Sequence, residues 1–96
     1  MKIKELCTEE RPREKMASKG AGALTNAELL AILIGSGTQK ENVLEVANRL
    51  LARSEGRLGA IASMTVQDMS ETDGIGHGRS AVITAAFELG KRRCLE

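Results

Sequence analysis

A glycine turn that opens directly onto a long helix is the feature that most constrains this chain. The turn and helix occupy residues 73–93, DGIGHGRSAVITAAFELGKRR. Because glycine has no Cβ, Gly74 and Gly76 are both expected to take positive φ and to approach another molecule closely. The first amide groups of the helix lack partners within the helix and lie at the positive end of its macrodipole. Such a helix start attracts phosphate, so the pattern predicts an anion site, typical of the second half of a helix-hairpin-helix.

The side chains around this turn extend the predicted site. Arg79, three residues after Gly76, falls in the first helical turn, where its guanidinium can add a charged donor to the same anion. His77 is expected to be an exposed loop residue or a phosphate contact. A glycine-rich loop that merely joins two packed helices explains the same residues, and both interpretations stay open at this point. The candidate DNA-contacting residues are Gly74, Ile75, Gly76, His77, Gly78, Arg79 and Lys40.

Length and composition favour a single all-α domain. A chain of 96 residues is too short for two independent cores, so we expect an N-terminal arm at residues 1–11 and one helical domain over residues 12–94. Phe87 is the only aromatic residue, and aliphatic side chains on closely packed helices must therefore form the core. The expected fold is a compact bundle of five to six short helices. The 14 basic and 13 acidic residues nearly cancel, so any electrostatic footprint for nucleic acid must be local.

The cysteines and the single histidine argue against a metal site or export. Cys7 and Cys94 belong to no CxxC motif and read as free thiols in a reducing cytosol. His77 is the only histidine, so a zinc site lacks closely spaced ligands. No signal-like segment opens the chain and no apolar run reaches about 18 residues, so we expect a cytoplasmic protein without a membrane partner. Leu95 and Glu96 are the kind of pair that a removed tag leaves behind.

The remaining sequence divides into short helices. Pro12 suits the first turn of a helix that glycines end near residue 20. Thr25 and Glu28 form a capping box for a buried helix over residues 26–34. Further helices are expected over residues 41–54, over residues 57–64, and after a Thr65–Asp68 cap.

The pattern of the last helix predicts which of its faces is buried. The buried arc is expected to contain Val82, Ile83, Ala86, Phe87 and Leu89. The solvent side is expected to contain Ser80, Thr84, Glu88 and Lys91.

An internal repeat relates the two glycine turns. Gly35-Ser36-Gly37 and Gly74-Ile75-Gly76 are separated by 39 positions, from residue 35 to residue 74. The same offset pairs Lys40 with Arg79, Val43 with Val82, Leu44 with Ile83, Ala47 with Ala86 and Leu50 with Leu89. The first unit is interpreted as degenerate, because Ser36 replaces the apolar plug Ile75 and the following loop is longer. Chance similarity between two amphipathic helices is the alternative.

Three segments carry a resemblance to a known family. Together, ERPREKM, LTNAELLAILIGSGT and DGIGHGRSAVITAAFELGKRR resemble the N-terminal region of the bacterial RadC-like family, also called UPF0758, over nearly the whole chain. The resemblance implies a helix-hairpin-helix, a DNA-repair name, and a metalloprotease-like MPN/JAB domain that usually follows. The His-x-His zinc motif of that domain does not occur here, so the chain corresponds to the N-terminal domain alone. The hairpin maps onto Gly74, Ile75 and Gly76, and the next basic position onto Arg79.

The sequence departs from the family pattern before the first glycine. Thr72 and Asp73 stand where an aliphatic residue and a lysine are common, and Asp73 places a negative charge beside the predicted phosphate site. Hairpins of this family can bind a monovalent cation through turn carbonyls, here those near Asp73, Gly74 and Gly76. No other cofactor is expected.

Two functions from different classes follow from these observations. The first is a DNA-binding module for duplex or junction backbone, independent of sequence because phosphate contacts carry no base information. In that case Arg79 is expected to matter more than Lys40. The second is a protein-interaction or dimerisation domain that positions a metalloprotease-like domain without binding DNA. Clustering of the basic residues around the glycine turns favours the first, and an exposed apolar patch elsewhere favours the second. No enzyme activity is expected, because no nucleophile is paired with a base.

Overall fold

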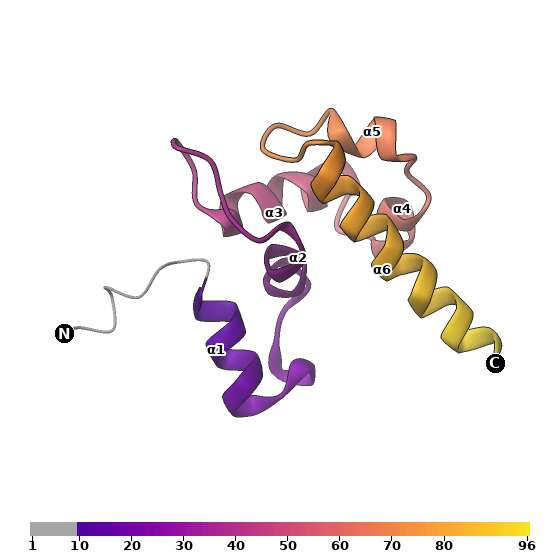
Figure 1. The fold of residues 1–96 in the computed structure, drawn as a ribbon, viewed down its shortest axis with the longest axis horizontal. Helices are drawn as coiled ribbons and strands as arrows, with labels where there is room; N and C mark the ends of the chain where they lie inside the picture. Colours follow the sequence, from indigo (N-terminus) through magenta and orange to yellow (C-terminus); the bar gives the residue numbers. More distant parts are fainter. Residues whose placement is uncertain (1–9) are drawn as a thin grey trace.

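Six α-helices and one short 3₁₀ turn make up the described part of the chain, residues 10–96, in this computed structural model (Figure 1). In chain order they are α1 (Glu10–Lys19), η2 (Ala21–Ala23), α2 (Asn26–Ile34), α3 (Val43–Arg53), α4 (Leu58–Ala62), α5 (Val66–Ser70) and α6 (His77–Leu95). Residues 10–96 contain no strand, which confirms the all-α prediction. Within the same residues, no helix combines the length and apolarity needed to cross a bilayer. Most of the predicted N-terminal arm, including Cys7, lies outside the described residues.

The predicted capping box begins α2. Thr25 Oγ1 accepts a hydrogen bond from the Glu28 amide at 3.1 Å, and the Glu28 carboxylate accepts one from the Thr25 amide at 2.8 Å. Lys15 of α1 reaches the same carboxylate at 3.2 Å, which joins α1 to α2. The hydrogen bond from the Thr25 backbone, and next the Lys15 ammonium, lower the pKa of Glu28 below its ordinary value. These contacts therefore weaken only as the pH falls through that lowered pKa.

The next helices begin with side-chain caps as well. Asn42 and Glu45 form a second capping box, with both hydrogen bonds at 2.9 Å. This box was not predicted, and α3 begins two residues later than the expected helix over residues 41–54. Thr65 caps α5 as predicted, accepting from the Asp68 amide at 3.0 Å.

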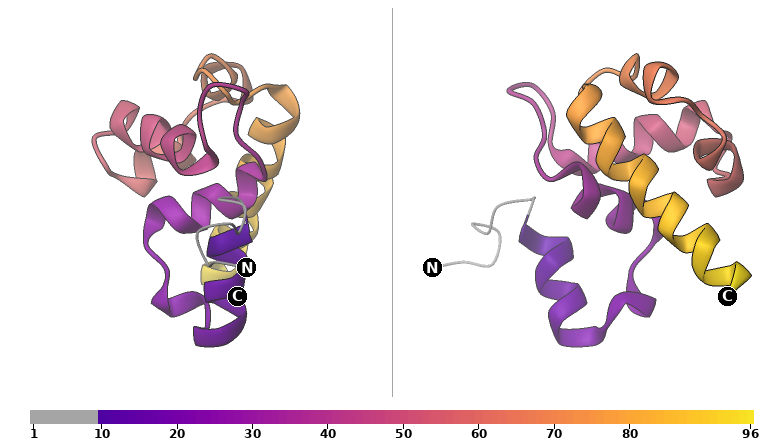
Figure 2. Two further views of the ribbon diagram at one scale, coloured as in Figure 1. Left: turned by 90° about the vertical axis from the view of Figure 1, so that its left-hand side faces the viewer. Right: turned by 45° about the vertical axis from the view of Figure 1, so that its right-hand side comes forward.

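The core lies between α2, α3 and the first half of α6. Its buried residues are Leu30, Ala31 and Ile34 of α2, Val43, Val46, Ala47 and Leu50 of α3, Ile61, Met69, Ile75, and Ile83 of α6. The short helices α4 and α5 pack against α6, whereas α1 stands to one side and contacts η2 and α2 (Figures 1 and 2). Each of the helices α2 to α6 thus contributes at least one residue to the buried cluster.

The buried face of α6 differs from the prediction. Ile83 is buried as expected, but Val82 is 48% exposed and Leu89 is 68% exposed. Ser80, predicted to face solvent, is fully buried, and Thr84 is half-buried. The turn before α6 explains the error. Ile75 is fixed in the core two residues before the helix starts, so the turn sets the rotation of α6, rather than the apolarity of its side chains.

The buried hydroxyl of Ser80 leads to a stability prediction. Within the described structure, the Oγ of Ser80 and the Oγ1 of Thr84 are buried without a hydrogen-bond partner. Burial of an unpaired hydroxyl is unfavourable, so Ser80→Ala is expected to raise the free energy of unfolding by about 1 kcal/mol in urea denaturation. Ser18→Ala, the same change on an exposed helical position, is the matched control and should gain only about 0.5 kcal/mol of helix propensity. A destabilised Ser80→Ala protein would contradict the prediction.

Candidate nucleic-acid interface

The turn between α5 and α6 is closed by its own backbone and by a buried plug. The Ile75 amide donates to the Thr72 carbonyl at 3.0 Å, and the Ile75 side chain is 1% exposed. Gly74 has φ of +93°, which confirms the prediction of positive φ at this residue. The same prediction is wrong at Gly76, whose φ of −92° and ψ of −172° are extended. Gly76 is the N-cap of α6, and an N-cap residue normally adopts this β-region conformation.

The two glycines also differ in their surroundings: Gly74 packs closely against other residues of the protein, whereas Gly76 faces open space. A Cβ on Gly74 would lie 2.9 Å from Val46 Cγ2 and 3.4 Å from Thr38 Cγ2. Gly74 is therefore required by packing inside the protein. A Cβ on Gly76 or Gly78 would meet nothing within 4 Å, so this side of the turn is open.

The start of α6 is the exposed, uncapped end of a long helix. Gly76, His77 and Gly78 are exposed, and no side chain caps the helix, in contrast to α2, α3 and α5. The imidazole of His77 lies 3.4 Å from the Gln67 side chain of α5. The first amide groups of a 19-residue helix thus face outward, as the sequence predicts for an anion site.

Arg79 lies beside this site but is engaged within the protein. Its Nη1 donates to the Gly74 carbonyl at 2.9 Å, and its Nη2 donates to Ser36 Oγ at 2.8 Å. The guanidinium is half-buried and connects the turn to the loop over residues 35–42. Both views in Figure 2 place that loop next to the α5–α6 turn. In this geometry Arg79 holds the turn in place. The sequence instead predicted that Arg79 would contact an anion directly.

Two arginines of α3 that were not among the predicted site residues also hold the turn. Arg49 Nη1 donates to the Asp73 carbonyl at 2.8 Å, and Arg49 also pairs with Glu41. Arg53 Nη1 donates to Thr72 Oγ1 at 2.7 Å and to the Asp68 carbonyl at 2.9 Å. Arg49 and Arg53 are four residues apart and therefore lie on the same face of α3. This spacing is the sequence signal that could have indicated that both contact the same segment.

These contacts bear on the predicted monovalent-cation site. The Asp73 carbonyl accepts from Arg49, the Gly74 carbonyl from Arg79, and the Gly76 carbonyl from the Ser80 amide at 2.9 Å. All three proposed ligand oxygens thus already accept hydrogen bonds, two of them from guanidinium groups. Positive charge at this turn is supplied by arginine side chains.

The internal repeat holds at the first glycine of each turn and breaks down after it. Gly35 and Gly74 both have φ of +93°. Gly37, however, is followed by five more residues before α3 begins at Val43, so the loop is longer, as predicted. Two of the paired helical positions differ in burial, because Val43 and Leu50 are buried whereas their counterparts Val82 and Leu89 are exposed. Ser36 is exposed and bonds Arg79 where Ile75 is buried.

Comparison with known proteins decides the family. The sequence profile of the UPF0758 N-terminal region matches residues 3–81. The chain belongs to the UPF0758 family. This confirms the resemblance inferred from the sequence.

Curated UPF0758 proteins align with almost all of the chain. A UPF0758 protein of Clostridioides difficile is 46% identical over 92 residues, and one of Bacillus licheniformis is 45% identical over 92 residues. A UPF0758 protein of Moorella thermoacetica is 48% identical over 90 residues. These alignments cover 94–96% of this chain but only 39–41% of each relative. No solved structure matches the chain.

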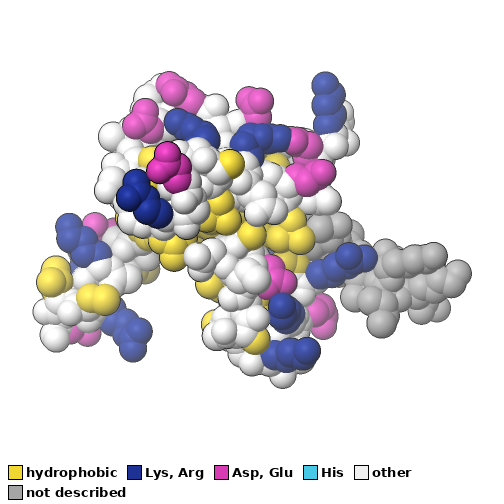
Figure 3. Space-filling view, turned by 180° about the vertical axis from the view of Figure 1, so that it is seen from behind, with side chains coloured by type: hydrophobic (Ala, Val, Ile, Leu, Met, Phe, Trp, Pro, Cys, Tyr) yellow, Lys and Arg dark blue, Asp and Glu magenta, His cyan; other side chains and the backbone are white. Residues whose placement is uncertain are grey.

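Charges around the hairpin of this UPF0758 domain are mixed. Lys40 is exposed on the neighbouring loop, but Asp68, Glu71 and Asp73 are exposed on the α5–α6 side. The basic run at residues 91–93 lies near the far end of α6, about 20 Å from its start at 1.5 Å per residue. Figure 3 shows acidic and basic side chains interspersed over the upper part of one face. Of the basic residues that could gather at the glycine turns, Arg79 and Lys40 therefore lie beside them, whereas Lys91, Arg92 and Arg93 do not.

Residues 10–96 contain no group of three His, Cys, Asp or Glu side chains placed to hold a metal ion.

Proposed function

We propose that this UPF0758 domain binds the phosphate backbone of duplex or junction DNA, weakly and without sequence preference. The contacting element is a helix-hairpin-helix formed by α5, the turn and α6. The observation that supports it is the start of α6, where Gly76, His77 and Gly78 are exposed and no side chain caps the helix. Backbone amides at a helix start bind phosphate through hydrogen bonds and the macrodipole.

The residues of the site divide into contacts and supports. The amides of residues 76–78 donate to phosphate oxygens, with Lys40 as a nearby exposed cation. Arg79 and Arg49 hold the turn carbonyls and thereby fix the position of the helix start. Amide contacts carry no base information, so the binding is independent of sequence. We propose no catalytic step, and we place the domain in the cytoplasm.

The mixed charges set the expected strength. The exposed acids Asp68, Glu71 and Asp73 offset the basic groups near the turn, so long-range attraction to DNA is small. Binding is therefore expected in the range of about 10⁻⁴–10⁻⁶ M that non-specific backbone contacts provide.

Salt dependence tests the proposal. In fluorescence anisotropy titrations with a duplex and a four-way junction, affinity is expected to fall about fivefold between about 50 and 300 mM salt, for the one phosphate that Lys40 neutralises. Duplexes of different sequence should bind equally. Equal affinity at both salt concentrations, or a strong preference for one sequence, would show that backbone contacts are not the source of binding.

The structure identifies the cleanest variant for this experiment. Gly76→Val adds bulk at the helix start where the backbone is extended and the space is open, so binding should fall, while losing glycine at the N-cap should lower the free energy of unfolding by only about 1 kcal/mol. Lys40→Glu is the matched charge probe on an exposed loop residue. Arg79→Glu should weaken binding more than Lys40→Glu, but it also breaks two hydrogen bonds of the turn and lowers stability. Parent-like binding by Gly76→Val at low salt would contradict the proposal.

A second candidate function is a protein-interaction domain that positions the rest of a longer protein. One observation favours it, an open apolar groove between α2, α4 and α6. This groove lies away from the hairpin turn, so the two functions do not compete for one surface.

A further inference from the structure

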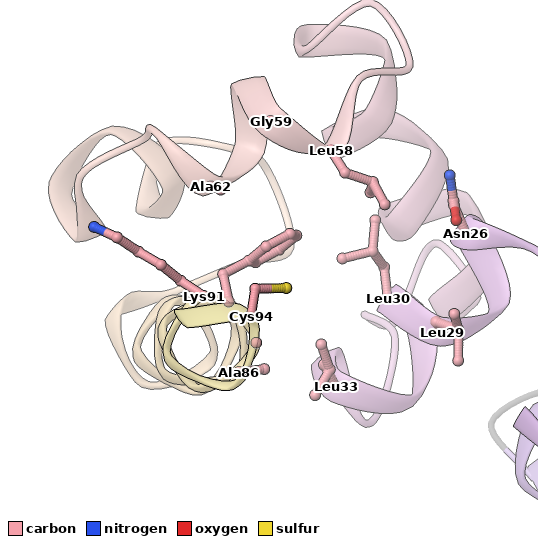
Figure 4. A pocket seen from close by; sticks show the side chains of 12 residues that line it. Asn26, Leu29, Leu30, Leu33, Leu58, Gly59, Ala62, Ala86, Lys91 and Cys94 are labelled. Carbon is pink, nitrogen blue, oxygen red and sulfur yellow. The ribbon is translucent and has the colours of Figure 1, made fainter. Parts of the chain in front are cut away.

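The groove lies between α2, α4 and the second half of α6 and has a volume of about 580 Å³ (Figure 4). Its walls are almost entirely apolar. The principal side chains are Leu29, Leu30 and Leu33 of α2, Leu58 of α4, and Phe87 and Cys94 of α6. In Figure 4 the Cys94 sulfur points toward Leu30 across the groove, and the Lys91 amino group points away from the leucines.

No other segment of residues 10–96 closes this groove. Leu58 at its edge is 38% exposed, and all of residues 88–96 are exposed. The second half of α6 extends beyond the other helices in Figure 1. Most helices in proteins are stabilised by packing of an apolar face, and beyond Phe87, which packs against the core, the groove side of this half-helix stays open within the described chain.

We propose that the groove is the docking site for the segment that follows this domain in the longer UPF0758 proteins. The matched region is the N-terminal one and covers only 39–41% of the curated relatives, so these proteins carry further chain beyond it. That chain leaves from the end of α6, and Cys94 in the last turn already lines the groove. The occupant is an amphipathic helix that lays its apolar side chains between α2 and α6.

Effective concentration favours this occupant over a second copy of the domain. A segment joined by a short linker is present at about millimolar concentration, independent of dilution. A second copy must compete from solution at whatever concentration the protein reaches. The docking site is independent of DNA binding at the α6 start, so failure of either proposal leaves the other intact.

Labelling of Cys94 provides a direct test. A chimera is made in which this chain replaces the matched region of the Clostridioides difficile relative, with Cys7 and the cysteines of the added region changed to serine. Cys94 is exposed in the 96-residue chain and should react rapidly with a maleimide. With an effective concentration of about 1 mM and a docking Kd of about 0.1 mM, labelling in the chimera should be about tenfold slower.

Two glutamate substitutions separate docking in the groove from a general effect of charge. Gly90→Glu places a charge in the groove, where an added Cβ meets nothing within 4 Å, and should restore rapid labelling of the chimera. Leu89→Glu adds the same charge on the outer face of α6 and should leave Cys94 protected. Circular dichroism checks that both variants keep their helices.

Three results would overturn the proposal. The first is equal labelling rates in the chimera and in the 96-residue chain. The second is protection that survives Gly90→Glu, because the covering segment would then lie elsewhere. The third is protection in the 96-residue chain that grows with protein concentration, which would assign the groove to a second copy.

Discussion

Gly74→Ala is expected to lower the free energy of unfolding by about 2–4 kcal/mol, because two unfavourable terms add at this position. At φ of +93°, a residue with a Cβ is strained whatever the surrounding space. The new Cβ would also lie 2.9 Å and 3.0 Å from the two methyl groups of Val46, a fully buried core residue. Urea denaturation followed by circular dichroism measures the loss.

Gly76→Ala is the matched control for this prediction. Gly76 has extended backbone angles and open space around its Cα, so alanine should lower the free energy of unfolding by no more than about 1 kcal/mol, the cost of a less favourable N-cap residue. Equal losses from the two substitutions would mean that the turn geometry described for Gly74 is wrong. A difference would assign the two glycines separate roles, one in packing and one at the exposed helix start.

Gly37→Ala is expected to cost about 2–3 kcal/mol for a purely steric reason. An added Cβ would overlap the Glu41 carbonyl oxygen and lie 2.7 Å from the Asn42 carbonyl carbon. Both contacts are backbone atoms, so the loop itself must move. That movement would disturb the Asn42 cap of α3 and the Arg79–Ser36 hydrogen bond at the other end of the loop.

The control for Gly37→Ala is Gly22→Ala, at an exposed position in η2 where a Cβ meets nothing within 4 Å. It should leave the midpoint of urea denaturation nearly unchanged. A Gly37→Ala protein as stable as the parent would show that the loop over residues 35–42 rearranges at little cost.

Local sequence signals predicted most of the helices, because their causes are local. The Thr25–Glu28 box and the Thr65 cap depend on residues three positions apart, and both are present. The glycine turn before α6 was also recognisable, since positive φ at Gly74 and an apolar plug at Ile75 follow from residue type. The family resemblance rested on the same segments.

Features that depend on distant parts of the chain could not be predicted in this way. The rotation of α6 is set by the anchoring of Ile75 in the core, which no periodicity within α6 reports. Arg49 and Arg53 are charged residues on the polar face of an amphipathic helix, and their partners 24 and 19 positions away become neighbours only in the fold. The groove is likewise lined by residues of α2, α4 and α6, which are far apart in the sequence.

The arginine contacts make the hairpin and α3 open as one cooperative unit. Arg49 and Arg53 hold the turn from α3, and Arg79 holds it to a loop 43 positions away in sequence. A local fluctuation that loosens the start of α6 must break these bonds at the same time, so its free energy approaches that of opening α3. By contrast, α1 joins the rest through η2 and α2 and can fray separately. A ligand at the start of α6 would therefore reduce the opening of α3, although it touches no residue of that helix.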